Sequence, residues 1–258
     1  MRLAVVIPAF NEARTIRGVV IGALRESPIV VVVDDASTDG TSQALSGLPA
    51  RVVRHETNLG KAAALWTGFD VAMAEGADYV ATLDGDGQHD PADLRRLVNA
   101  AARYPRAIVI GARLLDRASA PPSRRVANRI ADFWISWAAG YPIADSQSGE
   151  RLYPSSLLRV IEGTQDRGAS FTFESEILIR GARIGFTSVA VPIRSIYPPG
   201  GRRSHFRPVR DIARIVSMVA RALLARGLYL PGLWNSLRAA PLVVECADSS
   251  DDALKIVA

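Results

Sequence analysis

Two aspartates separated by a glycine form the segment of this sequence best suited to chemistry. Asp84 and Asp86 end an apolar run and are followed by Gln88 and His89, with glycines at 85 and 87. Carboxylates are hard oxygen ligands that suit Mg²⁺ or Mn²⁺, and these ions often complete their coordination with substrate phosphates. Because Asp and Gly also form solvated turns, the two aspartates alone do not decide between a turn and a metal site. The apolar run before them and the Gln-His pair after them favour the metal site.

Two more polar segments follow apolar runs. PAFNE (8–12) follows the first run, and DDASTDGT (34–41) follows the second. In an open parallel sheet, ligands bind beyond the carboxyl ends of the strands, so we expect all three segments to meet at one crevice. Asp34 or Asp35 can accept hydrogen bonds from a nucleotide base or from ribose hydroxyls. Asp39 suits either a helix cap or a contact with a ligand.

The elements that must position these residues alternate along the chain. Short β-branched runs alternate with longer amphipathic stretches, which is typical of an α/β fold with a mostly parallel sheet flanked by helices. The predicted strands are 3–8, 29–34, 51–54, 79–84, 107–113 and 187–193. The predicted helices are 12–26, 41–48, 60–75, 91–103, 124–140, 155–162, 173–183 and 211–226.

The sequence pattern changes after residue 113. We expect one domain over residues 1–206, with a nucleotide-binding half (1–113) and an acceptor half (114–206), followed by a helical appendage over 207–258. The predicted helix at 211–226 has an apolar face and a stripe of arginines. It either packs its apolar face on the core or lies on an anionic membrane. Packing is favoured because that face lacks the Trp and Phe typical of interfacial helices.

The composition indicates a folded protein with an excess of cations. The 258 residues contain 31 Lys and Arg against 26 Asp and Glu, and nearly all the cations are Arg, which suits phosphate binding. The arginines are not interleaved with exposed aromatics, so we expect no nucleic-acid partner. A single cysteine, Cys246, excludes an intramolecular disulfide and favours a cytoplasmic setting. We expect neither a signal peptide nor a transmembrane helix, and nothing in the sequence indicates an oligomeric state.

Two other classes of nucleotide enzyme are disfavoured by the segment after the first predicted strand. It has neither the Gly-x-Gly-x-x-Gly of dinucleotide binders nor the glycine-rich Lys-Ser/Thr loop of ATPases. A sugar-phosphate nucleotidyltransferase, one alternative, would have a glycine-rich loop and a basic residue there. A non-catalytic nucleotide-sugar-binding protein is the second alternative, and the intact Asp84 and Asp86 argue against it.

Four segments together resemble a known family. They are VVIPAFNEARTI (5–16), VVDDASTDGT (32–41), NLGKAAAL (58–65) and LDGDGQHDP (83–91). Residues 3–113 resemble the nucleotide-binding half of family 2 glycosyltransferases, which have the GT-A fold. DSQSGERLYP (145–154) and FESE (173–176) are similar to segments of the dolichyl- or polyprenyl-phosphate sugar synthases of that family. The resemblance covers about residues 1–206 and is weaker after the two aspartates.

The resemblance implies an inverting hexosyltransferase that moves a sugar from a UDP- or GDP-linked donor to an acceptor such as a polyprenyl phosphate or another lipid. It implies that Mg²⁺ or Mn²⁺ and the donor diphosphate are held by Asp84, Asp86 and Gln88. It implies that the donor is contacted by Pro8, Ala9, Asn11, Glu12, Asp35, Lys61 and Gly85. The acceptor phosphate would be faced by Ser148 and Arg151, and the loop arginines Arg202 and Arg203 would close over phosphates unless they are simply solvated.

The acceptor decides whether a base is needed. A hydroxyl acceptor requires a carboxylate to take its proton, and the candidates are Asp145, Glu174 and Glu176, of which Glu176 best matches the family pattern. Asp145 and Glu176 could instead pair with arginines. A phosphate acceptor needs no strong base.

Two features depart from the family pattern. Glu150 stands where the family usually has an aromatic residue, and it adds a negative charge beside the proposed acceptor site. The transmembrane helices of many relatives are absent, so a lipid acceptor would be met peripherally, at the inner face of the membrane.

Overall fold

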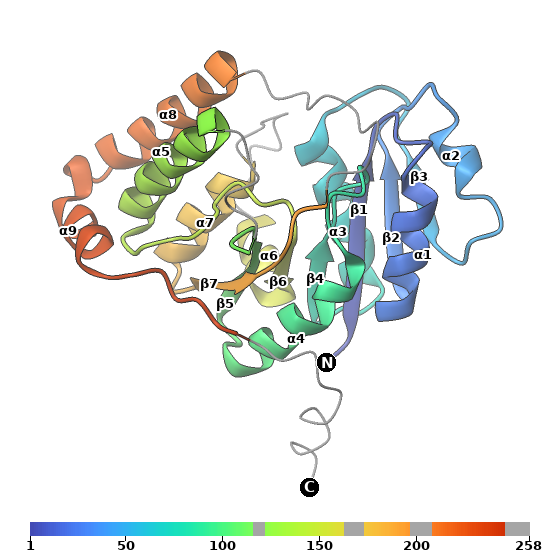
Figure 1. Cartoon of the computed structure of the whole chain (residues 1–258), viewed down its shortest axis with the longest axis horizontal. Helices are drawn as coiled ribbons and strands as arrows, with labels where there is room; N and C mark the ends of the chain where they lie inside the picture. Colours follow the sequence, from blue (N-terminus) through green and yellow to red (C-terminus); the bar gives the residue numbers. More distant parts are fainter. Residues whose placement is uncertain (116–121, 163–172, 197–207, 246–258) are drawn as a thin grey trace, which may run out of the picture.

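The computed structural model describes residues 1–115, 122–162, 173–196 and 208–245. Its centre is a seven-stranded sheet in the order β3-β2-β1-β4-β6-β5-β7 (Figure 1). The strands are β1 (Leu3–Ala9), β2 (Ile29–Asp34), β3 (Arg51–Arg54), β4 (Tyr79–Thr82), β5 (Ala107–Ala112), β6 (Arg151–Pro154) and β7 (Thr187–Pro192). The pairs β1–β2, β2–β3, β1–β4 and β5–β7 are parallel, and β6 runs antiparallel between β4 and β5. The predicted mostly parallel sheet is confirmed.

Helices cover both faces of the sheet. They are α1 (Ile16–Glu26), α2 (Thr41–Ala44), α3 (Lys61–Ala74), η1 (Pro91–Asp93), α4 (Leu94–Arg103), α5 (Pro122–Ala139), α6 (Ser155–Glu162), α7 (Phe173–Arg183), α8 (Pro208–Leu224), η3 (Gly227–Tyr229) and α9 (Leu230–Arg238). The predicted helices exist, but those at 12–26 and 41–48 are shorter than expected. The sequence pattern missed β6 and α9. β6 has four residues inside a polar segment, and α9 contains Pro231 and Gly232, which weaken the helical signal.

The alternating side chains of the central strands build two cores. In β1, Ala4 and Val6 join the core on the side of α3, whereas Val5 and Ile7 join the core on the side of α1 and α4. All six residues of β2 are buried, as expected for a strand covered on both faces. The burial explains why the sheet edge that bears the polar segments is held in a fixed place.

Helices α5, α8 and α9 lie together at the end of the molecule opposite β3 and α2 (Figure 1). Val219 and Leu223 of α8 are buried in the same core as Ile135 of α5. Part of the apolar face of α8 therefore packs inward, as the favoured one of its two predicted arrangements requires, whereas Val216 and Leu224 of that face are exposed. None of the helices in the described ranges is long and apolar enough to cross a membrane.

Helix α3 packs closely on β1 at Gly68. A Cβ at this position would overlap Cγ1 of the buried Val6, so we expect Gly68→Ala to lower the free energy of unfolding by roughly 1–3 kcal/mol. Gly18, also inside a helix, has open space around it, and Gly18→Ala should raise stability by up to about 1 kcal/mol. Urea unfolding of both variants measures the difference. Equal effects of the two substitutions would contradict the packing argument.

Candidate active site

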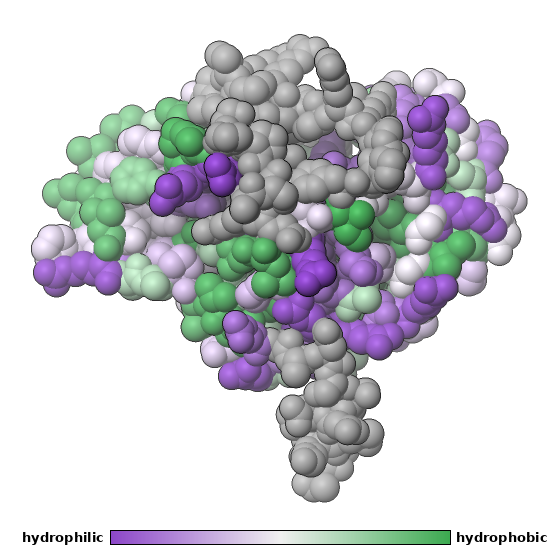
Figure 2. Space-filling view, in the orientation of Figure 1, coloured by the Kyte–Doolittle hydropathy of each residue, from purple (hydrophilic) through white to green (hydrophobic). Residues whose placement is uncertain are grey.

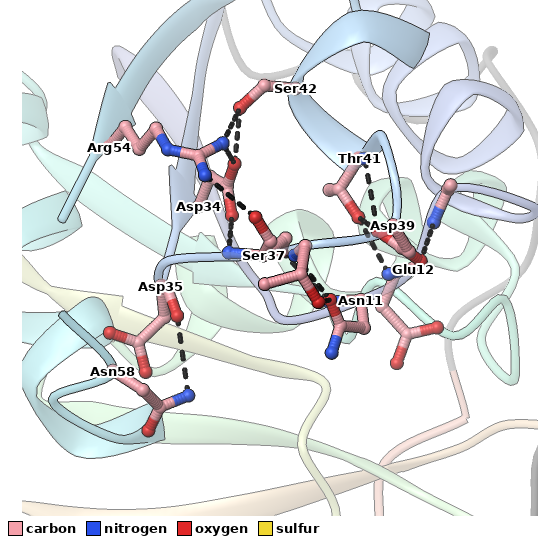
Figure 3. Close-up of polar contacts among 12 residues, drawn as sticks. Asn11, Glu12, Asp34, Asp35, Ser37, Asp39, Thr41, Ser42, Arg54 and Asn58 are labelled. Atoms are coloured by element: carbon pink, nitrogen blue, oxygen red, sulfur yellow. Dashed lines mark hydrogen bonds and ion pairs between the residues drawn. The ribbon is translucent and has the colours of Figure 1, made fainter. Parts of the chain in front are cut away.

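The three polar segments predicted to converge lie side by side at the carboxyl edge of the parallel strands. Asn11 donates its backbone N–H to Oγ of Ser37 at 2.9 Å, and Glu12 donates its own to Oγ1 of Thr41 at 2.8 Å (Figure 3). Oγ1 of Thr15 donates to the carbonyl of Gly85 at 2.7 Å. The segment after β1 is thus tied to the segment after β2 and to the segment after β4.

Asp34 and Asp39 hold the loop after β2. Asp34 is fully buried, and its carboxylate accepts from the backbone of Ser37 at 2.8 Å, from Oγ of Ser42 and from Arg54 at 2.8 Å (Figure 3). Asp39 accepts from the backbone of Thr41 at 3.1 Å and from its hydroxyl at 2.6 Å. A second oxygen of Asp39 accepts from the backbone of Ala13 at 3.1 Å. These contacts hold the turn that precedes α2, but the cap of that helix is Gly40 and it has no side-chain cap hydrogen bond, so the predicted helix-cap role of Asp39 is wrong and its contact with a ligand stays a prediction.

Asp35 positions the start of α3. Its Oδ1 accepts from the backbone of Leu59 at 2.8 Å, its Oδ2 accepts from Gly60 at 2.7 Å, and Nδ1 of His55 lies 2.7 Å from Oδ1. Both carboxylate oxygens of Asp35 are thus already in use. A nucleotide base or ribose that contacts Asp35, as predicted, would have to share these oxygens with the backbone N–H groups and His55. Sequence reasoning missed His55, because no motif links it to Asp35.

Lys61, the first residue of α3, joins two carboxylates from distant parts of the chain. Its Nζ lies 2.7 Å from Oδ1 of Asp84 and 2.7 Å from Oε1 of Glu174, the first-turn acid of α7. Burial lowers the pKa of Lys61, but the two carboxylates outweigh it and raise that pKa above its usual range. For Asp84, burial acts to raise the pKa, but Lys61 and the other nearby basic groups together have the larger effect. The pKa of Asp84 is therefore lowered. Asp84 is therefore held ionised.

Asp86 lies in a less favourable electrostatic environment. Its Oδ1 accepts from the backbone of Gln88 at 3.0 Å, which fixes the turn. Burial and then the negative charge of Asp84 raise the pKa of Asp86. A cation bound between the two aspartates would offset both effects, and the donor set of carboxylate oxygens fits Mg²⁺ or Mn²⁺. Within the described ranges, no group of three or more His, Cys, Asp and Glu side chains is arranged to hold a metal, so a cation at the two aspartates would need further oxygen ligands from elsewhere.

Gly149 makes room for the carboxylate of Asp84. A Cβ at position 149 would overlap that carboxylate, and the carbonyl of Gly149 accepts from Oγ1 of Thr82 at 2.7 Å. The segment before β6 is therefore held against the end of β4. This close approach requires a glycine, and sequence reasoning did not single it out.

A buried His–Glu pair lies behind Asp84. Nδ1 of His89 is 3.2 Å from Oε2 of Glu150, and its Nε2 is 4.0 Å from Oδ2 of Asp84. Burial lowers the pKa of His89, but Glu150 outweighs it and raises that pKa. Glu150 itself is fully buried and its pKa is raised by burial. Glu150, expected from the sequence to place a negative charge beside the acceptor site, therefore faces His89 in the interior. This position weakens the argument that Glu150 would repel a phosphate acceptor.

The side chains of Ser148 and Arg151 have structural contacts. Both are fully buried, and Arg151 donates to the carbonyl of Ser148 at 2.9 Å, to that of Ser146 at 2.7 Å and to that of Glu174. Oγ of Ser148 donates to the carbonyl of Gly111. The predicted contact of these two side chains with an acceptor phosphate is not supported by this arrangement, because their donors already serve backbone carbonyls.

Two of the three candidate bases are paired with arginines. Asp145 accepts from Arg113 through two guanidinium contacts of 2.6 and 2.8 Å, and Glu176 pairs with Arg180 one turn along α7. Burial raises the pKa of Asp145, but Arg113 outweighs it and lowers that pKa. Both residues therefore fit the alternative of arginine partners. Glu174 instead lies at Lys61.

The remaining predicted donor contacts lie around the end of β1. Pro8 and Ala9 end the strand, and Gly85 lies so close that a Cβ there would be 3.4 Å from the carbonyl of Pro8. Asn11 has a φ of 58°, and its Oδ1 accepts from the backbone of Thr38 at 2.7 Å. Whether Pro8, Ala9, Asn11 and Glu12 contact a nucleotide stays a prediction. Arg202 and Arg203 lie outside the described residues.

Comparison with curated proteins gives relatives whose names include dolichyl phosphate and polyprenol monophosphomannose. The chain is 30% identical over 213 residues to UDP-N-acetylglucosamine–dolichyl-phosphate N-acetylglucosaminyltransferase of Methanococcus voltae, covering 74% of this chain and 84% of that protein. It is 31% identical over 203 residues to polyprenol monophosphomannose synthase of Mycolicibacterium smegmatis, covering 74% of this chain and 76% of that protein.

Solved structures share the fold at lower identity. Glucosyl-3-phosphoglycerate synthase from Mycobacterium tuberculosis, in complex with Mn²⁺, UDP and glucosyl-3-phosphoglycerate, aligns with a TM-score of 0.56 at 23% identity, over 87% of this chain and 79% of that chain. Mannosyl-3-phosphoglycerate synthase from Rubrobacter xylanophilus aligns with a TM-score of 0.60 at 19% identity, over 88% and 75% of the two chains. The predicted GT-A fold is confirmed.

A family model described as glycosyl transferase family 2 matches residues 4–156, more than half of the chain. The match agrees with the four motifs and with the named relatives. It argues against the two alternative functions, a sugar-phosphate nucleotidyltransferase and a non-catalytic binding protein. The chain belongs to glycosyl transferase family 2 and is a hexosyltransferase.

Proposed function

We propose that this enzyme transfers a sugar from a nucleoside-diphosphate sugar to a polyprenyl phosphate with inversion at the anomeric carbon, assisted by Mg²⁺ or Mn²⁺. The observation that carries the proposal is the cluster of Asp84, Asp86 and Lys61 at the carboxyl edge of the sheet. In this proposal an acceptor oxygen attacks the anomeric carbon while the bond to the donor diphosphate breaks. A divalent cation, when bound by Asp84 and Asp86 with Gln88 nearby, supplies positive charge for the leaving diphosphate.

Lys61 supports donor binding in two ways. It keeps Asp84 ionised and fixes its orientation, and Asp35 in turn fixes the backbone from which Lys61 projects. The donor's base and ribose would lie over the loops that follow β1 and β2, where residues 11–12 and 37–41 are already held together. The Mn²⁺ and UDP in the complex of glucosyl-3-phosphoglycerate synthase are consistent with this choice of ligands.

Two observations support a polyprenyl-phosphate acceptor: the names of the relatives and the arginine partners of the candidate bases. Two relatives at 30% and 31% identity are named as a dolichyl-phosphate N-acetylglucosaminyltransferase and as a polyprenol monophosphomannose synthase. A phosphate oxygen is already anionic and needs no strong base, which agrees with the pairing of Asp145 and Glu176 with arginines. Because this acceptor is a membrane lipid, the proposal also includes a cytoplasmic enzyme that works at the inner face of a membrane.

Nucleotide-dependent stabilisation tests the donor and the metal. A nucleotide sugar present at 100 times its Kd should raise the free energy of unfolding by about 2.7 kcal/mol. We expect one of UDP-, GDP- or dTDP-sugars to raise the melting temperature more with Mn²⁺ than without it. Asp86→Asn should abolish the metal-dependent part of this shift, because the variant removes one of the two carboxylates.

Asp78→Asn is the matched control, since the Asp78 side chain is 61% exposed and remote from the cluster. It should keep the full metal-dependent shift. An unchanged shift in Asp86→Asn would remove Asp86 from the metal site.

Product analysis tests the acceptor. With the donor identified by the melting experiment, a short-chain polyprenyl phosphate should be glycosylated, and the corresponding polyprenol without phosphate should not. Mass spectrometry of the lipid product and NMR of its anomeric configuration measure both points. Transfer to the alcohol at a comparable rate, or retention of configuration, would contradict the proposal.

The assignment of Asp145 to an arginine pair predicts a pH-dependent loss of stability. Asp145→Asn should lower the free energy of unfolding at pH 7 by about 3 kcal/mol, because Arg113 loses a buried partner. The pKa of Asp145 is lowered in the folded state, so the contribution of the pair is complete above the ordinary aspartate pKa of about 4 and is lost as the pH falls below it. Urea unfolding should therefore show the two proteins converging at low pH. A difference that persists at low pH would argue against the ionised pair.

A further inference from the structure

We propose that the exposed apolar surface of α5, η3 and α9 is the site at which the enzyme contacts an anionic lipid membrane. This inference rests on the proposed lipid-linked acceptor for its purpose, but the surface is defined by exposed residues alone. Figure 2 shows hydrophobic side chains gathered at this end of the molecule.

Helix α9 exposes its apolar residues instead of packing them. Leu230, Trp234 and Leu237 are spaced by four and three positions, so they share one face, and they are 63%, 57% and 62% exposed. Gly232 is the buried residue of the helix. An amphipathic helix normally turns such a face to the core, so its exposure here indicates an external partner.

Helix α5 extends the same surface. Val126, Ile130 and Phe133 are exposed on one of its faces. Phe133 packs edge-on against Trp134 with 5.4 Å between ring centroids, and Trp134 stacks on Trp137 at 5.3 Å. The indole N–H of Trp137 donates to the carbonyl of Leu228 in η3 at 3.0 Å, which joins the aromatic cluster of α5 to the segment that leads into α9.

Cations lie directly on this surface. The guanidinium of Arg226 is 3.4 Å from the ring centroid of Tyr229, and that of Arg238 is 3.8 Å from the ring centroid of Trp234. Arg125 and Arg129 are exposed on α5. Among residues 122–139 and 225–238 the sequence has one acid, Asp132, whose carboxylate accepts from Ser146 at 2.6 Å.

The combination of apolar side chains, tryptophan and arginines selects the partner. Trp and Tyr favour the headgroup region of a bilayer, and arginines pair with anionic headgroups. A second copy of this chain would bring the same arginines to the interface, so like charges would oppose its association. An anionic membrane offers complementary charge together with an apolar interior.

The surface is connected to the active site through one helix. α5 packs on α7, and the first turn of α7 carries Glu174, which contacts Lys61. A lipid phosphate drawn from a membrane at α5 and α9 would therefore enter from the acceptor side. The apolar face of helix α8 is covered in part, because Val219 and Leu223 are buried whereas Val216 and Leu224 are 40% and 68% exposed, so the proposed surface is assigned to α5, η3 and α9.

Vesicle flotation tests the proposal. The 258-residue chain is mixed with vesicles of phosphatidylcholine alone or with added phosphatidylglycerol. We expect it to float with the anionic vesicles and to be released by salt, because headgroup contacts with arginines are screened. The double variant Trp234→Glu/Leu237→Glu should lose roughly tenfold or more in vesicle binding, because two apolar groups are replaced by charges of the same sign as the lipid.

Two further variants separate the apolar and ionic contributions. Arg226→Gln/Arg238→Gln should lose the preference for phosphatidylglycerol while keeping the apolar face. Val160→Glu introduces the same charge at a 52% exposed position of α6 and should bind vesicles like the wild type. Circular dichroism and the nucleotide-dependent melting shift show that each variant is folded.

The outcomes are distinct. Absence of flotation by the wild type, or equal flotation of the wild type and Trp234→Glu/Leu237→Glu, would overturn the proposal. A dimer in light scattering that this double variant dissociates in the absence of lipid would also overturn it. Flotation needs no turnover, so failure to glycosylate a polyprenyl phosphate counts against the proposed function, whereas normal glycosylation of a short-chain acceptor without flotation counts against the membrane surface.

Discussion

The ammonium of Lys61 is the contact on which the arrangement of the active site depends. It lies between a carboxylate at the end of β4 and a carboxylate at the start of α7, and so links two parts of the chain that are far apart in sequence. One cation shared by two carboxylates leaves a net negative charge at the site. Asp86 adds to that charge when it is ionised, and its pKa is raised because burial and the charge of Asp84 disfavour its ionised form. The polypeptide thus holds an excess of negative charge that a divalent cation could balance, which is the physical basis for the proposal that a metal binds at this edge.

The shell around this contact consists of buried polar groups that fix backbone positions. Asp34, Asp35 and Arg151 each satisfy several donors or acceptors of neighbouring loops, and none of them is free to move without breaking these contacts. Because a buried polar group without a partner costs free energy, such networks hold loops in one conformation. His89 and Glu150 add an ionisable pair behind Asp84. Some of the residues that the sequence suggested as ligands, such as Asp35 and Arg151, therefore hold the surrounding loops in position.

The sequence predicted the local elements and missed contacts between distant ones. The apolar run of β2 and the polar ends of β1, β2 and β4 are local patterns, and the parallel arrangement brings their ends together without further information. The pairing of Lys61 with Glu174, of His55 with Asp35 and of Asp145 with Arg113 depends on which chain segments pack together, which no local pattern encodes. Ser148 and Arg151 were assigned to an acceptor through a motif, but burial turns their donors toward carbonyls. The short strand β6 was missed for the same reason, since its four residues form a strand by pairing with β4 and β5.

The position of β6 has a consequence for how the chain reaches its native state. β5 is made before β6 in the chain, yet β6 separates it from β4, so β5 cannot join the sheet until residue 154 is available. Before that point the β4 edge presents unpaired backbone groups, which are prone to wrong pairing with other chains. During synthesis on the ribosome, the strands β1 to β4 would therefore wait as an open half-sheet, and the addition of β6, β5 and β7 would be a late, long-range event of the kind that slows folding.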